Sequence, residues 1–468
     1  MKYLLFVLIS FVFYGCSPKE IEVQEEISTE KEIVIQDSNI EEIVPSIGIG
    51  IKEIQLKDGE IYDLINIPQN IEFYTKSMKS KNGLYDIQKE YEKNYFYVWN
   101  ISKHKDSLNA SRWPFALHKV TNSYGENLEQ LKQEFFDQMY ENANFAEYST
   151  INVKAITIKE TNIRAFPTLK PLFRDPSLAG EGYPFDYLQN STIHANKPLF
   201  VSHYSKDKEW VFIFTSFTSG WIKSDELVIL DAKYTDIWQK AQQVSIVKED
   251  EPIYDTDGNF LFKSKIGMMF AIIEEDDKAY TVLSVSSYKN NIPLFLKSKI
   301  SKEIAHKGPL KFTKNNLDAI IKEVSKTNYG WGGLYEQRDC SSMLRDLYAP
   351  FGIWLPRNSS KQAAVGKIID FEKLSNDEKI AIIKKEAIPF ETFLYKKGHV
   401  MLYVGTYKNK PIIFHNFWGV RTIKNEVEGR VVIGKPIFST LELGKYQKDY
   451  DKESSILNKL QSLNIFTN

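Results

Sequence analysis

The sequence predicts a multidomain protein, in which a mostly helical N-terminal region and two small all-β units precede a C-terminal α+β domain. Three observations predict this order. The chain of 468 residues is long enough for about three domains or four small ones. Hydrophobic residues make up 43% of it and aromatic residues 13%, which is sufficient for packed cores. Along the chain, helical spacing of apolar residues gives way to short strands, and these give way to alternating helices and strands.

Composition and charge exclude several classes of protein. Sixty basic and 61 acidic side chains give a net charge of -1, which argues against a sequence-independent nucleic-acid binder. Cys16 and Cys340 are the only cysteines, which excludes a disulfide scaffold and a multi-cysteine zinc site. No apolar run reaches the roughly 18–20 residues of a membrane span. We expect no metal, no organic cofactor and no nucleic-acid partner.

The first 16 residues are expected to be an export signal. A lysine precedes an apolar stretch at residues 3–13 that is too short to span a bilayer, and Gly15 comes directly before Cys16. This segment resembles a bacterial lipoprotein signal, which implies cleavage before Cys16 and lipidation of its thiol. An ordinary signal peptide that ends near a cysteine is the alternative.

The residues after Cys16 predict where the protein is held. Ser17 is not the Asp of a retention signal, so the resemblance to Gram-negative lipoproteins implies the periplasmic face of the outer membrane. Residues 17–58 are rich in Glu and contain no aromatic residue. We expect them to form a disordered acidic tether, with a short helix as the alternative.

Residues 59–150 are expected to be mostly helical, with helices near 86–93 and 127–144. From residue 151 short strands separated by turns indicate small barrels or sandwiches, one over residues 151–235 and a more divergent one over residues 236–305. The strands predicted for the first unit are 153–158, 199–202, 210–215, 220–222 and 227–230.

The last domain is expected over residues 306–445, followed by a C-terminal tail at 446–468. A helix is predicted at 315–325, where apolar residues share one side. After a glycine-rich loop, a second helix is predicted at 341–348. The strands predicted after these helices are 400–404 and 412–417.

Cys340 is the one thiol left if Cys16 is lipidated, and its position favours a reactive role over that of a buried small hydrophobe. Asp339 is a good N-cap, so Cys340 falls at the first position of the helix. The helix macrodipole and the free backbone N–H groups at that position favour a thiolate. The same N–H groups suit the oxyanion of an acyl-transfer intermediate.

A thiolate nucleophile needs a general base and a residue that orients the base, and two histidines on predicted strands fit these roles. If the strands of His399 and His415 form a hairpin through residues 406–410, a symmetric register places Met401 opposite His415. His399 and His415 are then diagonal neighbours on one face. A slip of one residue would separate them, and two unrelated histidines are the alternative.

Together these motifs resemble the NlpC/P60 family of cell-wall cysteine peptidases, most strongly over the C-terminal quarter of the chain. The resemblance implies a papain-like α+β NlpC/P60 catalytic domain, two bacterial SH3 (SH3b) barrels, an N-terminal stabilising region and membership in the lipoprotein subgroup. For the second SH3b unit, a structural spacer is the alternative. The matching segments are 329–333 (YGWGG), 339–341 (DCS), 355–359 (LPRNS) with Gln362, 398–405 (GHVMLYVG) and His415, and for SH3b 162–168, 209–212 and 219–222.

The resemblance implies a γ-D-glutamyl-meso-diaminopimelate endopeptidase that hydrolyses peptidoglycan stem peptides. Carried over to this chain, Cys340 is the nucleophile, His399 the base and His415 the orienting residue. The other expected partner is the membrane, through the lipid on Cys16, and we expect a monomer. One alternative is another papain-like reaction on a cell-wall substrate, by an amidase or acyltransferase. A non-catalytic wall-binding lipoprotein is the other.

Five further residues are implied at the substrate. Tyr329 is placed near the oxyanion. Asp339 and Ser341 are placed at the free amine of an N-terminal L-alanine, in members that act on unlinked stem peptides. In those members the first SH3b domain closes one end of the groove. Asp186 and Tyr187 are candidates for that wall, with a structural turn as the alternative.

Two segments depart from the family pattern. Residues 389–395 replace the usual entry to the first catalytic histidine, and residues 370–386 form a long charged insertion. Both lie in the expected catalytic domain, so the sequence leaves the length of the substrate open.

Overall fold

The computed structural model describes residues 56–57, 60–76, 78, 87–289 and 292–467. The predicted signal with Cys16, and the predicted tether apart from residues 56–57, lie outside the described residues. Within the described part of the chain, no helix is both long and apolar enough to cross a membrane.

The N-terminal region is helical, as its apolar spacing predicts. Helix α3 (Ile87–Tyr95) lies at the first predicted position and α6 (Gln133–Asn142) within the second. α6 begins later than predicted because Leu128 adopts a left-handed backbone (φ 64°) and the Asn127 side chain accepts a hydrogen bond from the Glu129 N–H at 3.1 Å. The remaining helices are α1 (Tyr62–Asn66), α2 (Ile71–Thr75), α4 (Leu108–Ser111) and α5 (Trp113–Leu117), with 3-10 turns at Tyr97–Trp99, Val120–Asn122 and Phe145–Glu147.

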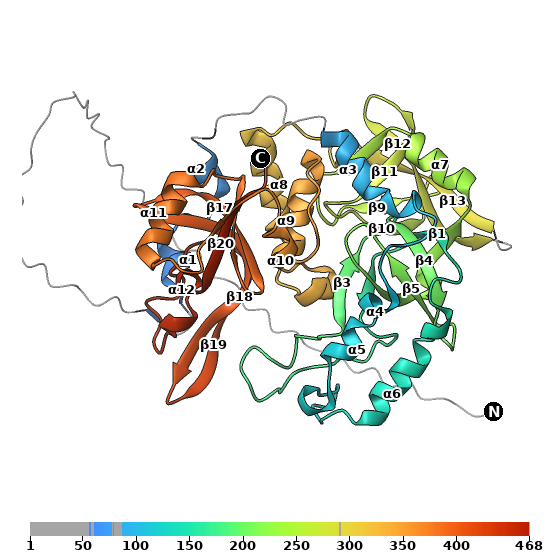
Figure 1. Ribbon diagram of the computed structural model, residues 1–468. Helices are drawn as coiled ribbons and strands as arrows, with labels where there is room; N and C mark the ends of the chain where they lie inside the picture. Colours follow the sequence, from blue (N-terminus) through green and yellow to red (C-terminus); the bar gives the residue numbers. More distant parts are fainter. Residues whose placement is uncertain (1–55, 58–59, 77, 79–86, 290–291, 468) are drawn as a thin grey trace, which may run out of the picture. The chain divides into compact units, whose positions relative to one another are not determined.

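The first barrel is a seven-stranded antiparallel sheet with the strand order β3-β2-β6-β5-β4-β1-β7. Figure 1 labels its strands β1, β3, β4 and β5. All five residues of β5 are buried, which is typical of a strand covered on both faces. Residues 165–188 connect β2 to β3. The strands are β1 (Val153–Thr157), β2 (Thr161–Arg164), β3 (Gln189–Ile193), β4 (Pro198–Tyr204), β5 (Trp210–Phe214), β6 (Ser219–Lys223) and β7 (Leu227–Leu230).

The second barrel follows helix α7 (Ala232–Lys240). It combines a five-stranded sheet, in the order β13-β12-β11-β8-β14, with the hairpin β9-β10. Val244, Phe270 and Val282 belong to its buried core. The strands are β8 (Gln243–Ile246), β9 (Pro252–Tyr254), β10 (Phe260–Lys263), β11 (Met269–Glu275), β12 (Ala279–Lys289), β13 (Ile292–Ser301) and β14 (Ala305–Lys307).

The C-terminal domain has a six-stranded sheet with the order β15-β20-β16-β17-β18-β19. Its strands are β15 (Lys367–Asp370), β16 (Thr392–Lys396), β17 (His399–Tyr407), β18 (Lys410–Lys424), β19 (Val427–Thr440) and β20 (Leu460–Ile465). Its helices are α8 (Lys314–Val324), α9 (Cys340–Tyr348), α10 (Ser359–Gln362), α11 (Asn376–Glu386) and α12 (Ile456–Lys459), with 3-10 turns at Trp331–Glu336, Ala349–Phe351 and Lys452–Ser454.

The prediction that residues 446–468 form a C-terminal tail is wrong. Strand β20 pairs with β15 on one side and with β16 on the other, so it lies inside the sheet. Leu463 is fully buried and packs in the domain core. The alternation of Leu463 and Ile465 with polar neighbours is a strand signal too short to be recognised without its partners.

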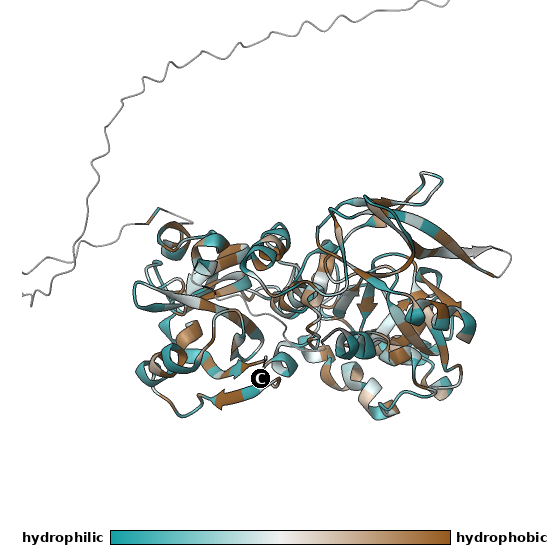
Figure 2. Ribbon diagram, turned by 90° about the horizontal axis from the view of Figure 1, so that it is seen from above, coloured by the Kyte–Doolittle hydropathy of each residue, from teal (hydrophilic) through white to brown (hydrophobic). Residues whose placement is uncertain are grey.

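The central sheet has two apolar faces because side chains alternate along its strands. Val400 and Leu402 share one core with residues of α8 and α9, whereas Met401 and Tyr403 share another with residues of α11 and α12. Figure 2 shows brown hydrophobic stretches within the strands and helices and teal hydrophilic residues at many connecting loops. Helix α9, which begins at Cys340, is therefore fixed against the strand that begins at His399.

Helices α1 and α2 also pack on the C-terminal domain. Oδ2 of Asp63 accepts hydrogen bonds from the backbone N–H of Thr440 at 2.7 Å and from its hydroxyl at 2.8 Å. The Thr75 hydroxyl donates to Oδ1 of Asp318 in α8 at 2.6 Å. The first part of the N-terminal region therefore supports the sheet and helix that flank the site described next.

Candidate active site

The N-terminus of α9 holds Cys340 in the predicted position. Oδ1 of Asp339 accepts the Ser342 N–H at 2.8 Å, and the Asp339 N–H donates to Oγ of Ser342 at 2.9 Å. This capping box makes Cys340 the first residue of the helix. The backbone N–H of Val400, the residue after His399, favours the ionised form of the Cys340 sulfur. Cys340 retains an exposed fraction of 7%, so it is buried but not sealed.

Strands β17 and β18 form the predicted hairpin in the predicted register. Leu402 lies opposite Phe414, which places Met401 opposite His415. The turn at residues 408–409 has a left-handed backbone at both positions (φ 46° and 60°), which matches the twist of a two-residue hairpin. The two histidines therefore lie on one face of the hairpin.

His399, His415 and Ser439 form a hydrogen-bonded chain that we call the imidazole relay. Nε2 of His399 lies 2.8 Å from Nδ1 of His415. Nε2 of His415 lies 2.9 Å from Oγ of Ser439. The Ser439 hydroxyl donates to the carbonyl oxygen of Thr440 at 3.0 Å. Each side chain of the relay is at least nine-tenths buried.

The direction of the relay depends on where the single proton of Ser439 lies. We assign that proton to the Thr440 carbonyl, an acceptor at 3.0 Å, so that Oγ accepts a hydrogen bond from Nε2–H of His415. Nδ1 of neutral His415 is then an acceptor, and Nε2–H of His399 donates to it. Nδ1 of His399 is left with a lone pair, which is what a general base requires.

Burial keeps both imidazoles neutral. It lowers the pKa of His399 well below its ordinary value, and the neighbouring His415 and Lys396 lower it further. It also lowers the pKa of His415 to about 3, again helped by Lys396. The relay is therefore an uncharged chain across the pH range in which such a base would act.

The thiol of Cys340 is also neutral, and this corrects the predicted thiolate. Burial raises the pKa of Cys340 to about 11, and the Asp339 carboxylate adds to the shift. Backbone N–H groups of Val400 and Ser341 act in the opposite direction, as the helix N-terminus predicts, but they are outweighed. The resting site therefore pairs a thiol with a neutral base, and the proton has to move when the sulfur attacks.

Family models match four successive parts of the chain. The model for the NlpC/P60 family matches residues 326–423, which include Cys340, His399 and His415. The N-terminal NLPC_P60 stabilising domain matches residues 5–148. SH3 domains of the SH3b1 and SH3b2 types match residues 171–223 and 231–277.

The chain belongs to the NlpC/P60 family. It has the stabilising region, the two SH3b domains and the catalytic domain that its sequence predicts. This membership supports a cell-wall peptidase of the cysteine type.

One of two similar solved structures shows the same fold. An NlpC/P60 endopeptidase from Photobacterium damselae subsp. piscicida is 23% identical, covers 86% of this chain and 98% of its own, and superposes with a TM-score of 0.75, which shows a common fold. An NlpC/P60 protein from Bacillus cereus ATCC 10987 is 15% identical over 67% of this chain and 100% of its own, with a TM-score of 0.43. No curated protein matches the chain.

Tyr329, which the resemblance implies near the oxyanion, lies close enough to Cys340 for the two side chains to interact electrostatically. Its ring centroid is 5.8 Å from that of Trp418, and its backbone N–H donates to the Gly434 carbonyl at 2.8 Å. Burial raises the pKa of the Tyr329 phenol well above its ordinary value, and the charges that Cys340 and Asp339 carry when ionised add to the shift. The phenol therefore remains a hydrogen-bond donor.

Asp339 and Ser341 are held by Arg357, a residue to which the sequence analysis gave no role. Nη2 of Arg357 lies 2.6 Å from Oδ2 of Asp339, and Nη1 donates to Oγ of Ser341 at 2.9 Å. Nε of Arg357 donates to Oγ of Ser191 in strand β3 at 2.8 Å, which links the first SH3b domain to this site. The Asp339 carboxylate thus has an internal cation, so its first function is to hold the start of α9.

Asp186 has a structural function, and this corrects its predicted contact with substrate. Oδ2 of Asp186 lies 2.6 Å from Nη1 of Arg164, and Oδ1 accepts the backbone N–H groups of Leu172 and Leu188 at 3.0 and 2.9 Å. The residue is 6% exposed. The carboxylate shapes the β2–β3 loop, which is the structural alternative that the sequence analysis left open.

Tyr187 does lie at the wall between the first SH3b domain and the catalytic domain. Its ring centroid is 5.2 Å from that of Trp331, and Phe185 lies 5.3 Å from Trp331 and 5.2 Å from Trp418. The hydroxyl of Tyr187 donates to Glu181 at 2.8 Å. The SH3b loop therefore meets the catalytic domain through aromatic rings next to Tyr329.

Two further residues position the site, and the sequence alone indicated no role for either of them. Gln362 lies in a segment that matches the family, and its Nε2 donates to the carbonyls of Ser341 and Pro356, each at 2.8 Å. Ser439 belongs to no motif. It reaches His415 only because β18 and β19 place Ile437 opposite His415, so that Ser439 is the diagonal neighbour.

Among the residues that the structure describes, no group of three or more His, Cys, Asp or Glu side chains is arranged to hold a metal ion.

Proposed function

We propose that this protein is an endopeptidase that cleaves the γ-D-glutamyl–diaminopimelate bond of peptidoglycan stem peptides. Cys340 is the nucleophile, His399 the general base and His415 the residue that orients it. The observation that carries the proposal is the imidazole relay, because it leaves Nδ1 of His399 with a lone pair beside the helix that presents the thiol. The specific bond rests on family membership.

In this mechanism, proton transfer and attack occur together. Nδ1 of His399 takes the thiol proton while the Cys340 sulfur attacks the γ-glutamyl carbonyl carbon. The oxyanion is met by the Tyr329 phenol and backbone N–H groups at the start of α9. The C–N bond then breaks, and His399 returns its proton to the departing amine. Water, deprotonated by His399, hydrolyses the thioester and regenerates the thiol.

Product analysis tests this proposal. Wild-type protein should release L-Ala-γ-D-Glu from purified tri- or tetrapeptide, detected by mass spectrometry, and Cys340→Ala should release none while keeping its melting temperature. Parallel incubation with intact sacculi separates wall remodelling from the processing of free stem peptides. Release of the dipeptide by Cys340→Ala would show that another group is the nucleophile.

We also propose that lipid on Cys16 anchors the protein at the periplasmic face of the outer membrane. The support is the sequence alone, in which a short apolar stretch and Gly15 precede Cys16. Labelling with radioactive palmitate should mark the wild-type chain and be lost in Cys16→Ser. Equal labelling of the two proteins would refute the anchor.

A further inference from the structure

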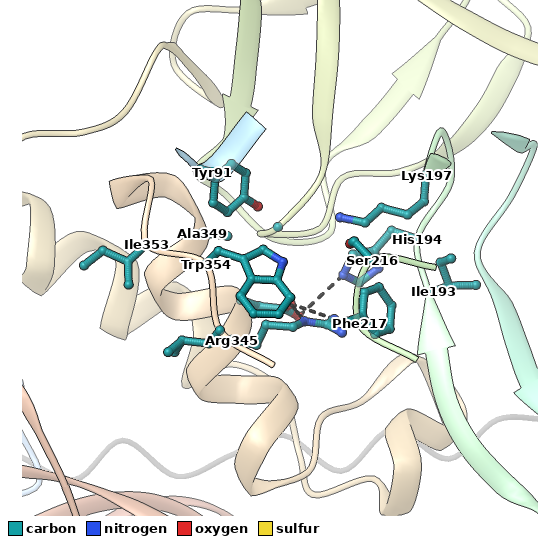
Figure 3. Close-up of a pocket in the computed structure, with 13 residues that line it drawn as sticks. Tyr91, Ile193, His194, Lys197, Ser216, Phe217, Arg345, Ala349, Ile353 and Trp354 are labelled. Atoms are coloured by element: carbon teal, nitrogen blue, oxygen red, sulfur yellow. Dashed lines mark hydrogen bonds and ion pairs between the residues drawn. The ribbon is translucent and has the colours of Figure 1, made fainter. Parts of the chain in front are cut away.

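A pocket lies where the two SH3b domains, helix α3 and helix α9 meet, and we call it the junction pocket. It encloses about 400 Å³, including its open mouth. Figure 3 shows that polar ends of side chains from all sides point toward its centre. The residues that line it include Tyr91, His194, Lys197, Ser216, Arg345 and Trp354.

The wall of the junction pocket contains a buried ionic cluster centred on Asp346. Oδ1 of Asp346 accepts hydrogen bonds from Nε and Nη2 of Arg345 at 3.1 and 2.9 Å, and Oδ2 accepts one from Nε of Arg338 at 2.8 Å. Nε2 of His194 lies 3.5 Å from the same oxygen, a distance that makes an ion pair rather than a hydrogen bond. One carboxylate is thus shared by three cationic side chains.

Two further carboxylates complete the cluster without balancing it. Glu249 pairs with Arg338 at 2.7 Å, and Glu160 pairs with Nδ1 of His194 at 3.0 Å. Counting Lys197, four cationic side chains then face three carboxylates when His194 is protonated. Burial alone would lower the pKa of His194, but the carboxylates of Asp346 and Glu160 raise it above its ordinary value.

In the described part of the chain, Lys197 is the cationic side chain of this cluster that has no carboxylate partner. Its ammonium lies 3.6 Å from the centroid of the Tyr95 ring and 5.8 Å from that of Phe217. No carboxylate lies within ion-pair distance of it among the described residues. Burial, and then the charge of Arg345, lower the pKa of Lys197 well below its usual range, and the charge of Asp346 opposes them only in part.

Arg345 provides the second free donor of the pocket. Its guanidinium stacks 4.2 Å from the Phe217 centroid. Its buried Nη1 has no hydrogen-bond partner within the described part of the chain. In Figure 3 the Lys197 ammonium, the Trp354 indole N–H, the Tyr91 hydroxyl and the Ser216 hydroxyl also converge on this space.

We propose that the junction pocket binds a small oxyanion, the carboxylate or phosphate group of a low-molecular-weight ligand. An anion would supply the charge that Lys197 lacks and accept hydrogen bonds from the converging donors. The aromatic rings beside it would cover an apolar part or a sugar ring of the ligand. A cationic ligand would meet Lys197 and Arg345, so the charge of the pocket excludes it.

The position of the site gives binding a structural consequence. His194 and Lys197 belong to the first SH3b domain, Tyr91 to α3, and Arg345 to the helix that begins at Cys340. A bound anion would therefore cross-link the domains behind the nucleophile helix. It should stabilise the folded protein in proportion to its occupancy, independently of any catalytic turnover.

Thermal unfolding of the purified full chain tests the site. Inorganic phosphate and N-acetylglycine are the two probes, titrated against chloride at equal ionic strength, and they separate a phosphate ligand from a carboxylate ligand. At least one of them should raise the wild-type melting temperature by several degrees, with a matching dissociation constant by calorimetry. No rise above the chloride control with either probe would overturn the proposal.

Three variants distinguish the site from general salt effects. Lys197→Met should lose the anion-dependent rise, and it should melt higher than wild type without anion. Methionine has a length similar to that of lysine, and it removes a partly buried charge that has no carboxylate partner among the described residues. Lys197→Arg should keep the rise. Lys233→Met, at an exposed lysine 6.0 Å from the Tyr234 ring centroid, is the matched control and should respond like wild type. An undiminished response in Lys197→Met would overturn the proposal.

Discussion

Two buried polar clusters lie along helix α9, and they hold opposite states of charge. At the start of the helix the imidazole relay of His399, His415 and Ser439 is neutral, because burial lowers the pKa of both imidazoles. One to two turns further, the cluster around Asp346 is ionised, because the charges of Arg345 and Arg338 hold the pKa of that carboxyl well below its usual range despite burial. Similar burial thus gives different charge states according to the partners provided.

The difference follows from what each cluster has to do. A general base needs a free lone pair, and a chain that ends on a serine hydroxyl fixes the tautomer without adding a charge. A junction between domains needs directional contacts that are costly to break, and shared ion pairs provide them. Under the proposed function, the cluster at the start of α9 would serve proton transfer, and the cluster further along would attach the domains to one another.

The largest expected effect comes from removing His399, the proposed general base of the relay. His399→Ala should lower kcat/KM by about 10⁴-fold, because it removes the proposed general base. Initial rates on a stem tetrapeptide, followed by mass spectrometry, measure this change. His306→Ala, at an exposed histidine in β14, is the control and should retain wild-type rates. A tenfold loss or less in His399→Ala would argue against the base assignment.

Breaking the ionised cluster should affect stability instead. Asp346→Asn leaves Arg338, Arg345 and His194 short of a shared carboxylate, and should lower the free energy of unfolding by about 3–5 kcal/mol. Urea denaturation measures it. Asp236→Asn removes an exposed pair with Lys240 and should change stability by less than about 0.5 kcal/mol. Equal effects of these two variants would mean that the Asp346 cluster contributes no more than a surface pair.

A smaller effect is expected at the far end of the relay. Ser439→Ala removes the acceptor that fixes the His415 tautomer, and should lower kcat by about tenfold with KM unchanged. Ser439→Thr keeps the hydroxyl and should recover most of the rate. If the alanine variant has a lower melting temperature but an unchanged kcat, Ser439 has a packing function only.

Stability should change with pH in opposite directions for the two clusters. This is the smallest effect among the four predictions. The lowered pKa values of His399 and His415 give stability that is present above about pH 6.5 and lost as the pH falls. The raised pKa of His194 gives stability that is complete below about pH 6.5 and lost as the pH rises through its folded value.

Urea denaturation between pH 5 and 9 measures the contribution of His194 as the difference between wild type and His194→Gln. That difference should be largest at the acid end and shrink toward the alkaline end. A difference that stays constant, or that grows with pH, would contradict the ion pairs assigned to His194.

Local features of the site could be predicted from sequence, whereas its long-range features could not. Asp339 caps α9 and the β17–β18 hairpin aligns His399 with His415, because each depends on residues close together in the chain. The contribution of Ser439 depends on how a third strand pairs, which no local pattern contains. The raised pKa of Cys340 depends on burial by distant elements, so the helix N-terminus alone predicted the wrong direction.

Strand β20 imposes an order of events on the enzyme. It lies between β15 and β16, so the sheet whose strands bring both imidazoles to the thiol cannot close until residues 460–465 are available. A chain that stops before residue 460 would therefore lack a strand from the interior of the sheet. We expect such a truncated chain to be less stable than the full chain, because β15 and β16 would both lose their partner.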